Sequence, residues 1–542
     1  MKTRKKGIIF FALVAGIMLA SGITIAVPGF ISGDDDLEVF VAGDGYTDEE
    51  RPQFCGTNDK PKSTDFVIEY KIPTPCTQPL AITTEPNGTV WFAETNTGNL
   101  GKFDPVTETF TEYTNSRWVA AESELKQKLR SMMWGMDYSP DGAIWYTDEA
   151  TDSIWRFSIA DEKYNTLNFP MLEGEESIPQ KLLVEGSDVI VNDFSGGKLT
   201  FFGYSQLGEL TYSAIPSPID GFTGDFAIDL EDNIWYTNWR PEVLQYENSA
   251  NTGTGILLKF DRSSWESQLT ISPEADSLLL QDFIQFFQFP SGMTTPNGVA
   301  IGSDQNIWIV DTSSSYFFSF DPVTEEYTKY VTSVPTIDSY GNASGFIKSP
   351  ISRPYWIEQS GNNLIMNEQT ANRIAVFNPS TETLVEYTIP SRNPNWSDCE
   401  GITYCGVAQV FDFAIDGKKI WFTEWVENNI GVVDTSISLP FSVDTDTQSI
   451  TLEKGQTANV SLLVMSEVIE TGTVTVNLST TSLFSDLVIT SEPKELYLDD
   501  SSKTVSIQIS ASDSALPGTH KVLLGAYNNE IAVSQFITVT IV

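Results

Sequence analysis

The stretch VWFAE, residues 90–94, recurs along the chain and decides its fold. Six later stretches align with it: IWYTD (144–148), VIVND (189–193), IWYTN (234–238), IWIVD (307–311), LIMNE (364–368) and IWFTE (420–424). The second residue of each copy is Trp in five and Ile in two, at positions 91, 145, 190, 235, 308, 365 and 421. Successive copies are therefore 45 to 73 residues apart, the length of a four-stranded unit with variable insertions. The pattern predicts an all-β fold, a seven-bladed β-propeller.

The residues around each copy supply the rest of a blade. A tight-turn pair such as Asn87-Gly88 precedes the copy, and further short strands lie on either side. The stretch FVIEYKIPTP (66–75) matches LVEYTIPS (384–391), the last strand of unit six, while unit seven has no fourth strand of its own. We therefore expect residues 66–75 to form the outer strand of blade seven and to close the ring, which removes exposed sheet edges.

Composition changes divide the chain into four parts. Basic residues followed by an uncharged apolar run predict a signal peptide or N-terminal membrane anchor in residues 1–32. An acidic stalk follows in residues 33–65 and the propeller in residues 66–438. Residues 439–542 lack tryptophan and alternate as short strands, which is typical of an immunoglobulin-like β-sandwich. We expect an extracytoplasmic protein, anchored in the cell membrane or secreted.

The cysteines and the net charge indicate the number of disulfides and the kinds of partner that the protein can have. Four cysteines in an exported chain suggest two disulfides, and of three possible pairings Cys55–Cys76 and Cys399–Cys405 close the shortest loops. The formal charge of −42, from 31 basic and 73 acidic residues, argues against nucleic acid as a partner. The same negative charge would be repelled by an anionic membrane, so we expect membrane contact only through the N-terminal segment.

Each repeat copy ends in a carboxylate or its amide, and these ends should gather at one face of the ring. The seven residues are Glu94, Asp148, Asp193, Asn238, Asp311, Glu368 and Glu424. Such an oxygen-rich set could hold one divalent cation, Ca²⁺ or Mg²⁺. The alternative is that each side chain bonds nearby backbone N–H groups and holds its own turn.

Aromatic residues cluster at the same predicted face. Trp239 and Trp425 directly follow two of the repeat copies and are expected to be exposed. Tyr355, Trp356 and Phe411 lie at or near the starts of innermost strands. These five residues are candidates for binding a sugar, peptide or cation. Packing inside the propeller is the alternative for all of them.

Three segments carry a resemblance to a known family. They are PNGTVWFAETNTGNLGKFDP, QTANRIAVFNP and IWFTEWVENNIGVV. They resemble the seven-bladed propeller of the streptogramin B lyases (virginiamycin B lyase), over about residues 66–436. The resemblance implies a reaction that uses histidines at the innermost-strand starts of the last blades, with nearby glutamates and Mg²⁺.

This chain departs from the family at those positions. Tyr355 and Phe411 stand where the histidines are expected, and Gln409 stands where a glutamate is expected. Phenylalanine cannot transfer a proton, and tyrosine is a poor base at neutral pH. Asp412 is the one titratable neighbour that could replace the base, so Asp412, Glu424 and Tyr355 are weak catalytic candidates.

The sequence thus favours a non-catalytic cell-surface propeller that binds a protein, glycan or small-molecule ligand through its acidic and aromatic face. The alternative is a lyase or lactone hydrolase that uses Glu368, Glu424 and Asp412 around a divalent metal. A purely structural component of the cell envelope is the third hypothesis.

Overall fold

The structure, a computed structural model, describes most of the chain from Cys55 onward. The described residues are 55–56, 60–118, 132–169, 177–195, 197–204, 210–216, 221–240, 255–271, 280–344, 349–468, 472–482, 486–499 and 501–542. The predicted N-terminal segment and most of the predicted stalk lie outside these ranges. Within them, no helix is long and apolar enough to cross a membrane.

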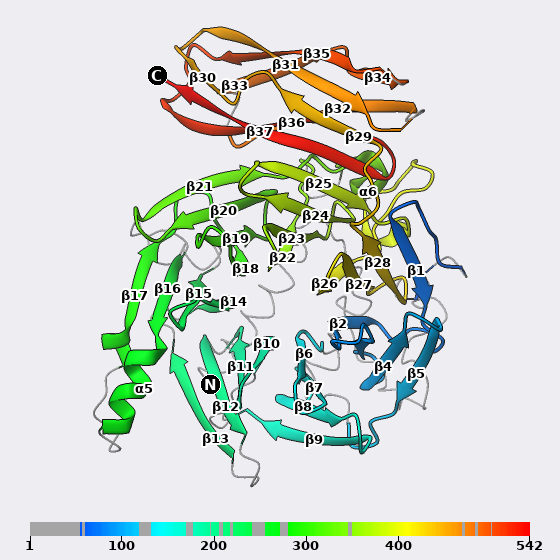
Figure 1. The fold of residues 1–542 in the computed structure, drawn as a ribbon, viewed down its shortest axis with the longest axis vertical. Coiled ribbons are helices and arrows are strands. Elements are labelled where there is room, and N and C mark those ends of the chain that lie inside the picture. Colours follow the sequence, from blue (N-terminus) through cyan, green and yellow to red (C-terminus); the bar gives the residue numbers. More distant parts are fainter. Residues whose placement is uncertain are drawn as a thin grey trace, which may run out of the picture.

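Seven four-stranded antiparallel blades surround a common axis, which confirms the predicted propeller (Figure 1). Blade one consists of β2 (Pro79–Thr84), β3 (Val90–Glu94), β4 (Asn99–Asp104) and β5 (Thr109–Tyr113). Blade two consists of β6 (Met136–Ser139), β7 (Ala143–Asp148), β8 (Ser153–Ser158) and β9 (Lys163–Asn168). Blade three consists of β10 (Pro179–Glu185), β11 (Asp188–Asp193), β12 (Lys198–Tyr204) and β13 (Leu210–Pro216).

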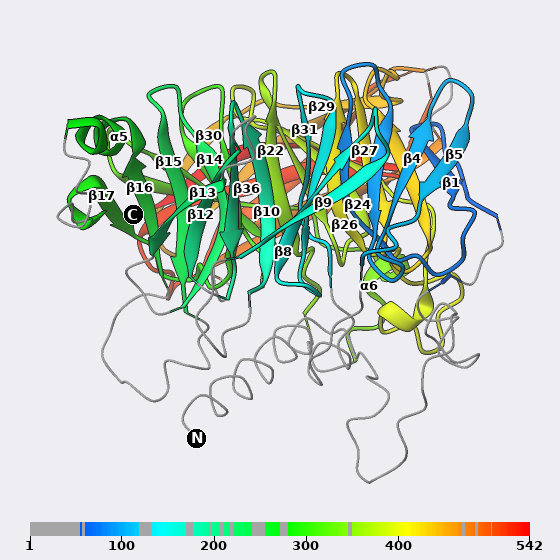
Figure 2. The same cartoon turned by 90° about the horizontal axis from the view of Figure 1, so that it is seen from below.

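Blades four to six consist of β14 (Phe222–Ile228), β15 (Asn233–Trp239), β16 (Gly255–Asp261), β17 (Ile284–Gln288); β18 (Pro296–Ile301), β19 (Ile307–Asp311), β20 (Tyr316–Asp321), β21 (Glu326–Val331); and β22 (Pro354–Ser360), β23 (Asn363–Glu368), β24 (Arg373–Asn378), β25 (Thr383–Thr388). Helix α5 (Arg262–Ile271) and the turn η2 (Leu280–Phe283) lie between β16 and β17. Helix α6 (Ile337–Tyr340) precedes β22, and the turn η3 (Pro394–Trp396) follows β25. Figure 2 shows the ring from its edge, with the blade strands running between its two ends and α6 at one of them.

Blade seven is completed from the N-terminal side, as the sequence predicts. Its own strands are β26 (Val410–Asp416), β27 (Lys419–Glu424) and β28 (Asn429–Asp434). The outer strand is β1 (Val67–Lys71), which pairs antiparallel with β28 from Val67 opposite Val433 to Lys71 opposite Asn429. Both predicted disulfides, Cys55–Cys76 and Cys399–Cys405, are present. The first lies beside the closing strand.

The large residue at the second place of the repeat packs between blades. All five of these tryptophans are buried. The Trp91 ring contacts Phe157 of the next blade at a centroid distance of 5.7 Å, and Trp421 of blade seven contacts Phe103 of blade one at the same distance. Each blade therefore hides its neighbour's apolar face, which explains why the repeat needs a bulky apolar residue there.

The fourth residue of the repeat joins neighbouring blades by hydrogen bonds. Thr423 Oγ1 of blade seven donates to the Leu80 carbonyl of blade one at 2.7 Å, and Thr237 Oγ1 donates to the Pro296 carbonyl of blade five at 2.8 Å. Asn367 Nδ2 donates to the Val410 carbonyl at 2.8 Å. Buried donors are thereby satisfied across the blade boundary, so this position stabilises the ring as well as the single blade.

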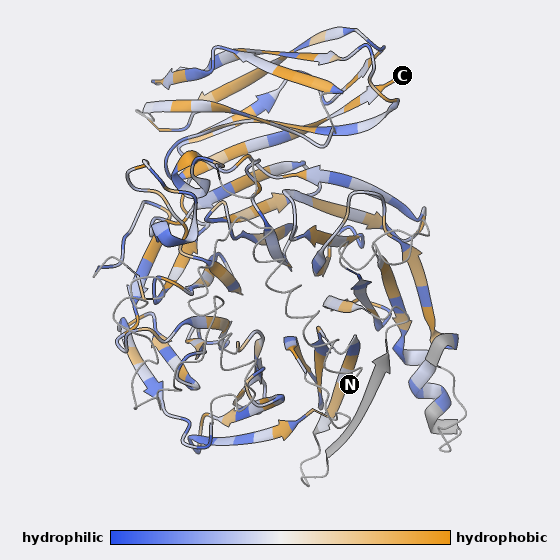
Figure 3. Cartoon of the chain, turned by 180° about the vertical axis from the view of Figure 1, so that it is seen from behind, coloured by the Kyte–Doolittle hydropathy of each residue, from blue (hydrophilic) through white to orange (hydrophobic). Residues whose placement is uncertain are grey.

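The described residues after the propeller form two packed sheets. One sheet has the order β29-β31-β35-β33, and the other contains β30, β37, β36, β32 and β34. The bounds are β29 (Phe441–Thr445), β30 (Ser449–Leu452), β31 (Thr457–Ser466), β32 (Gly472–Thr480), β33 (Leu487–Glu492), β34 (Glu495–Leu498), β35 (Lys503–Ala511), β36 (Gly518–Tyr527) and β37 (Ile531–Ile541). Apolar and polar positions alternate along these strands, and the apolar ones share one core (Figure 3).

The sandwich and blade six share a continuous sheet. The outer strand β25 pairs antiparallel with β37, from Thr383 opposite Gln535 to Tyr387 opposite Ile531. Phe536 packs against Tyr330 and Phe377 of the propeller at centroid distances of 5.2 Å and 5.8 Å. The edge that blade six would otherwise expose is therefore covered by the second domain.

Candidate functional site

The seven residues that end the repeat copies are buried and bond within their own blades. Asp148 accepts hydrogen bonds from Ala150 N at 3.0 Å and Thr151 Oγ1 at 2.6 Å. Asp311 accepts one from Thr295 N at 2.8 Å. These contacts match the turn-holding alternative. Among the described residues, no group of three His, Cys, Asp or Glu side chains is arranged to hold a metal ion.

Two of the glutamates at these positions face a second glutamate from the outer strand of the same blade. Glu424 faces Glu69 of β1, and Glu94 faces Glu112 of β5. Burial, followed by the Glu112 charge, raises the pKa of Glu94 to about 8. Burial and the Glu69 charge raise the pKa of Glu424 well above its usual value. Glu94 therefore stays largely protonated at neutral pH, and the raised pKa of Glu424 likewise favours its protonated form, because adjacent buried carboxylates repel each other.

Blade six repeats this pair with an arginine between the two carboxyls. Arg373 Nε lies 2.7 Å from Glu368 Oε2, and its Nη2 lies 3.2 Å from Glu386 Oε1. Glu386 also accepts a hydrogen bond from Ser333 N at 3.1 Å. A Glu-Tyr dipeptide marks the outer glutamate in all three blades, at Glu69, Glu112 and Glu386. That dipeptide is the sequence signal that could have revealed the pairs.

Lys181 of blade three lies among acids from three other blades. Lys181 Nζ of β10 lies 2.7 Å from Glu358 Oε1 of β22. The carboxyls of Asp225 and Asp412, from blades four and seven, also act on this lysine electrostatically. The cluster joins four blades, and Lys181 offsets part of the negative charge of its three acids.

Asp412, a weak candidate for a catalytic base, belongs to this cluster. Burial raises the pKa of Asp412 to about 7, and Oδ2 accepts a hydrogen bond from Ile82 N of blade one at 3.1 Å. Asp225 makes the corresponding bond to the backbone of Val299 in blade five, and burial raises its pKa to about 7 as well. The recurrence indicates that Asp412 fastens blade seven to blade one.

Five aromatic rings meet where the innermost strands begin, an end of the ring that we call the mouth. Trp134 stacks on Tyr355 at a centroid distance of 6.1 Å, although these residues come from blades two and six. Phe411 contacts both, and it also contacts Trp425, which in turn packs on Trp396 at 5.3 Å. Of the predicted aromatic residues, Tyr355, Phe411 and Trp425 meet in this cluster, whereas Trp239 packs on Phe194 and Phe222 elsewhere. The two positions that the resemblance assigns to histidines lie inside the cluster.

The prediction that Trp239 and Trp425 are exposed is wrong. Trp239 has an exposed fraction of 0%, because β15 continues past the repeat copy and pairs this residue with Phe222. Trp425 is 6% exposed, since its ring lies within the aromatic cluster of the mouth. Trp356 is also buried, beneath Lys181 Nζ at 5.4 Å from the ring centroid. Of the predicted ligand-binding residues, Tyr355 alone is partly exposed.

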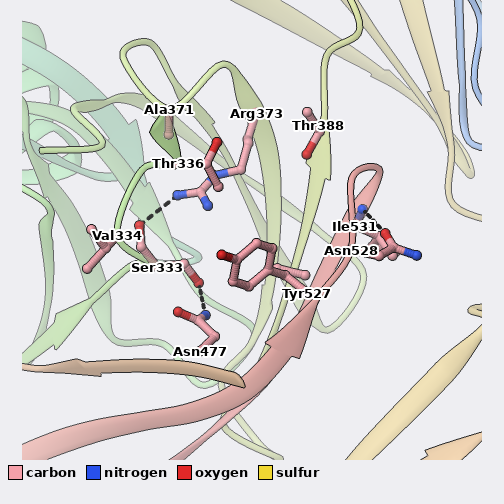
Figure 4. Close-up of a pocket in the computed structure, with 11 residues that line it drawn as sticks. Ser333, Val334, Thr336, Ala371, Arg373, Thr388, Asn477, Tyr527, Asn528 and Ile531 are labelled. Atoms are coloured by element: carbon pink, nitrogen blue, oxygen red, sulfur yellow. Dashed lines mark hydrogen bonds between the residues drawn. The ribbon is translucent and has the colours of Figure 1, made fainter. Parts of the chain in front are cut away.

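A small cavity of about 20 Å³ lies between blade six and the sandwich (Figure 4). Arg373 Nη2 donates to the Ser333 carbonyl at 2.7 Å, and Asn477 of the sandwich donates to the hydroxyls of Ser333 and Ser534. Tyr527 also lines this space. The volume suits about one water molecule, so the cavity is part of the domain interface.

Comparisons with known proteins concern the fold alone. No protein-family model and no curated protein sequence matches the chain. Virginiamycin B lyase from Staphylococcus aureus is similar in structure, with a TM-score of 0.48 and 18% identity over 68% of this chain and 98% of the other. A streptogramin B lyase structure gives 0.47 and 16%, over 68% and 96%. A catalytically inactive form of the S. aureus enzyme with quinupristin gives 0.47 and 18%, over 68% and 98%.

Proposed function

We propose that this chain is an exported, non-catalytic propeller that binds a ligand at its mouth. The observation that carries the proposal is the contact of Tyr355 and Phe411 with Trp134 at the two positions where the family resemblance implies histidines. Phenylalanine has no proton to exchange, and burial raises the pKa of the Tyr355 phenol further from neutrality. An aromatic mouth with a partly exposed phenol is suited to stacking on a ligand.

The alternative, a metal-dependent lyase or lactone hydrolase, has less support from the contacts of its three candidate acids. Glu368 pairs with Arg373, Glu424 accepts a hydrogen bond from Asn429 Nδ2 at 2.7 Å, and Asp412 bonds the backbone of blade one. The three carboxyls thus belong to three separate sets of contacts. Export is supported by the N-terminal apolar run and by the two disulfides, which fit an oxidising compartment.

A thermal-shift screen of the full chain against oligosaccharides and small organic molecules tests the binding function. We expect a ligand that raises the melting temperature of the wild-type chain and of the control Phe110→Ala on the outer strand β5. The same ligand should not stabilise Trp134→Ala. A screen without any stabilising compound would contradict the proposal.

Incubation with quinupristin and Mg²⁺, followed by mass spectrometry, tests the alternative. We expect intact quinupristin. A ring-opened product that is lost in Glu424→Gln would overturn the non-catalytic assignment and establish the lyase hypothesis.

A further inference from the structure

Arg353 is a buried arginine whose guanidinium has no ion-pair partner among the residues that the structure describes. It immediately precedes β22 at the mouth and is 5% exposed. Its backbone N–H donates to the Ser314 carbonyl at 3.1 Å, and its carbonyl accepts from Gln369 N at 3.1 Å. Its Nε is buried without a hydrogen bond, and no described residue forms an ion pair with the guanidinium. The backbone N–H and carbonyl of Arg353 are thus hydrogen-bonded, while its guanidinium has no ion-pair partner among the described residues.

Two other buried arginines in the described ranges are compensated, whereas Arg392 resembles Arg353 in having a buried Nε, and also Nη1, without a hydrogen bond. Arg373 lies between Glu368 and Glu386, and Arg262, which is largely buried, forms an ion pair with Glu185. Burial lowers the pKa of Arg353 to about 10, and the only group that acts against this is the Tyr355 phenol. A buried charge normally has a partner of opposite sign, because removing it from water is costly. In a chain with 73 acidic residues, a carboxylate could easily have been placed there.

Three neutral polar side chains, on segments near the backbone of Arg353, also lack hydrogen bonds. Both amide atoms of Gln369 and of Gln409 are buried without hydrogen-bond partners, as is Thr312 Oγ1. Buried polar atoms without partners are rare, and each requires an explanation such as a bound water or ligand. Three such side chains beside one uncompensated charge point to a common cause.

The backbone contacts place these residues on adjoining segments. Gln369 N donates to the Arg353 carbonyl, and the two neighbours of Gln409 are bonded to Asn372 and Asn367 of blade six. Ala408 N donates to Asn372 Oδ1 at 2.8 Å, and the Val410 carbonyl accepts from Asn367 Nδ2 at 2.8 Å. Blades six and seven therefore bring the backbones of Arg353, Gln369 and Gln409 to adjoining parts of the mouth.

The chemistry of this set selects a ligand class. A guanidinium presents paired N–H donors that match the two oxygens of a carboxylate. One positive charge balances one negative charge, whereas a phosphate dianion would remain half compensated. Neutral amides and a hydroxyl add hydrogen bonds without changing the charge balance.

We propose that Arg353 binds the carboxylate of a small organic ligand, with Gln369, Gln409 and Thr312 supplying further hydrogen bonds. This inference rests on the proposed binding function and names the chemical class of the ligand. The nearby Tyr355 and Trp134 rings favour an acid with an apolar or aromatic body.

Calorimetric titration of the full chain with sodium benzoate, at constant ionic strength set by sodium chloride, tests the site. We expect saturable binding of one benzoate, and a loss of affinity of at least tenfold in Arg353→Gln. The control Arg156→Gln removes an arginine that is already paired with Asp141 at 2.6 Å and should bind benzoate like the wild type. Sodium phosphate should bind more weakly than benzoate.

Melting temperatures provide a second measurement. Arg353→Met removes the uncompensated charge, so we expect its melting temperature without ligand to equal or exceed that of the wild type, and benzoate to have no effect on it. A lower melting temperature for Arg353→Met, together with no response of the wild type to benzoate, would show that the guanidinium is structural. Tighter binding of phosphate would overturn the carboxylate assignment.

The experiments distinguish failure of the carboxylate site from failure of the proposed binding function. A compound from the thermal-shift screen that binds Arg353→Gln as well as the wild type would refute the carboxylate site and leave the binding function intact. A carboxylate that requires Arg353 but binds Trp134→Ala as well as the wild type would support the carboxylate site and refute binding at the aromatic mouth.

Discussion

Glu69 and Glu424 are far apart in the sequence, yet their carboxyl groups face each other inside blade seven. Glu69 belongs to the N-terminal strand β1 and accepts hydrogen bonds from Ser391 N at 2.9 Å and Ser391 Oγ at 2.6 Å. Glu424 ends β27, and Glu427 adds further negative charge nearby. The ring is therefore closed beside a buried acid, Glu424, whose raised pKa favours the protonated form, which couples closure to pH.

We expect the chain to be more stable at pH 5 than at pH 8. The folded-state pKa values of Glu94 and Glu424 are raised, Glu94 from 4.5 to about 8, so the folded state binds more protons than the unfolded state in this window. Their contribution is present below about pH 4.5 and is lost as the pH rises through the folded-state values. Each pKa unit corresponds to about 1.4 kcal/mol, so the loss should be on the order of 2–4 kcal/mol. Urea unfolding at the two pH values measures it.

Glu424→Gln provides the control for this pH effect. Glutamine keeps the shape and the hydrogen bond to Asn429 but carries no charge at either pH. The free energy of unfolding of this variant should depend less on pH than that of the wild type and should be higher at pH 8. An unchanged pH dependence would show that the pair is not responsible.

The bond between Thr423 and Leu80 offers a direct test of how blades are held together. Thr423→Val keeps the shape of the side chain and removes the hydroxyl that donates across the boundary between blades seven and one. The Leu80 carbonyl would then lack this donor, so we expect a loss of about 1–2 kcal/mol in the free energy of unfolding. Thr435→Val, on the exposed turn after β28, is the matched control and should change little. Equal effects of the two substitutions would refute a special role for the blade boundary.

The two disulfides should differ in their contribution to stability. Cys55–Cys76 spans 21 residues and Cys399–Cys405 spans 6. Because the entropy removed from the unfolded chain grows with loop length, the replacement Cys55→Ser with Cys76→Ser should cost about 3 kcal/mol, and the other double replacement about 2 kcal/mol. Chemical denaturation of the two variants under oxidising conditions measures the difference. Deleting residues 55–76 should be more severe, because it also removes β1; a circular dichroism melt unchanged by that deletion would contradict ring closure.

The repeat predicted the propeller, and a second match, between two outer strands, predicted its closure. A buried Trp or Ile and a carboxylate or amide recur at fixed places because the residues at these places make equivalent packing contacts in every blade. The match between residues 66–75 and 384–391 identified β1, since the same position in two blades imposes the same alternation of apolar and polar residues. Among the seven terminal residues, Asp148, Asp193 and Asp311 accept backbone N–H hydrogen bonds, as the turn-holding alternative predicts.

Other features could not be predicted, because they depend on contacts between distant segments. Trp239 follows its repeat copy as if in a loop, but β15 is longer than the copy and buries the ring. Nothing near Arg353 in the sequence distinguishes a buried arginine from an exposed one. The joining of β25 to β37 leaves no local pattern either, because any strand with a free edge can accept a neighbour.

This joining predicts that the propeller and the sandwich unfold together. Phe536 of β37 is fully buried against Tyr330 and Phe377 of the propeller, so this residue of the sandwich belongs to a core cluster of the propeller. Truncating a buried phenylalanine to alanine costs about 3–5 kcal/mol, and in Phe536→Ala this loss falls on the interface. We expect a single calorimetric transition for the wild type and two separate transitions for Phe536→Ala. The exposed Val488→Ala, on the other sheet of the sandwich, should retain the single transition, and two transitions in the wild type would mean that the shared sheet does not couple the domains.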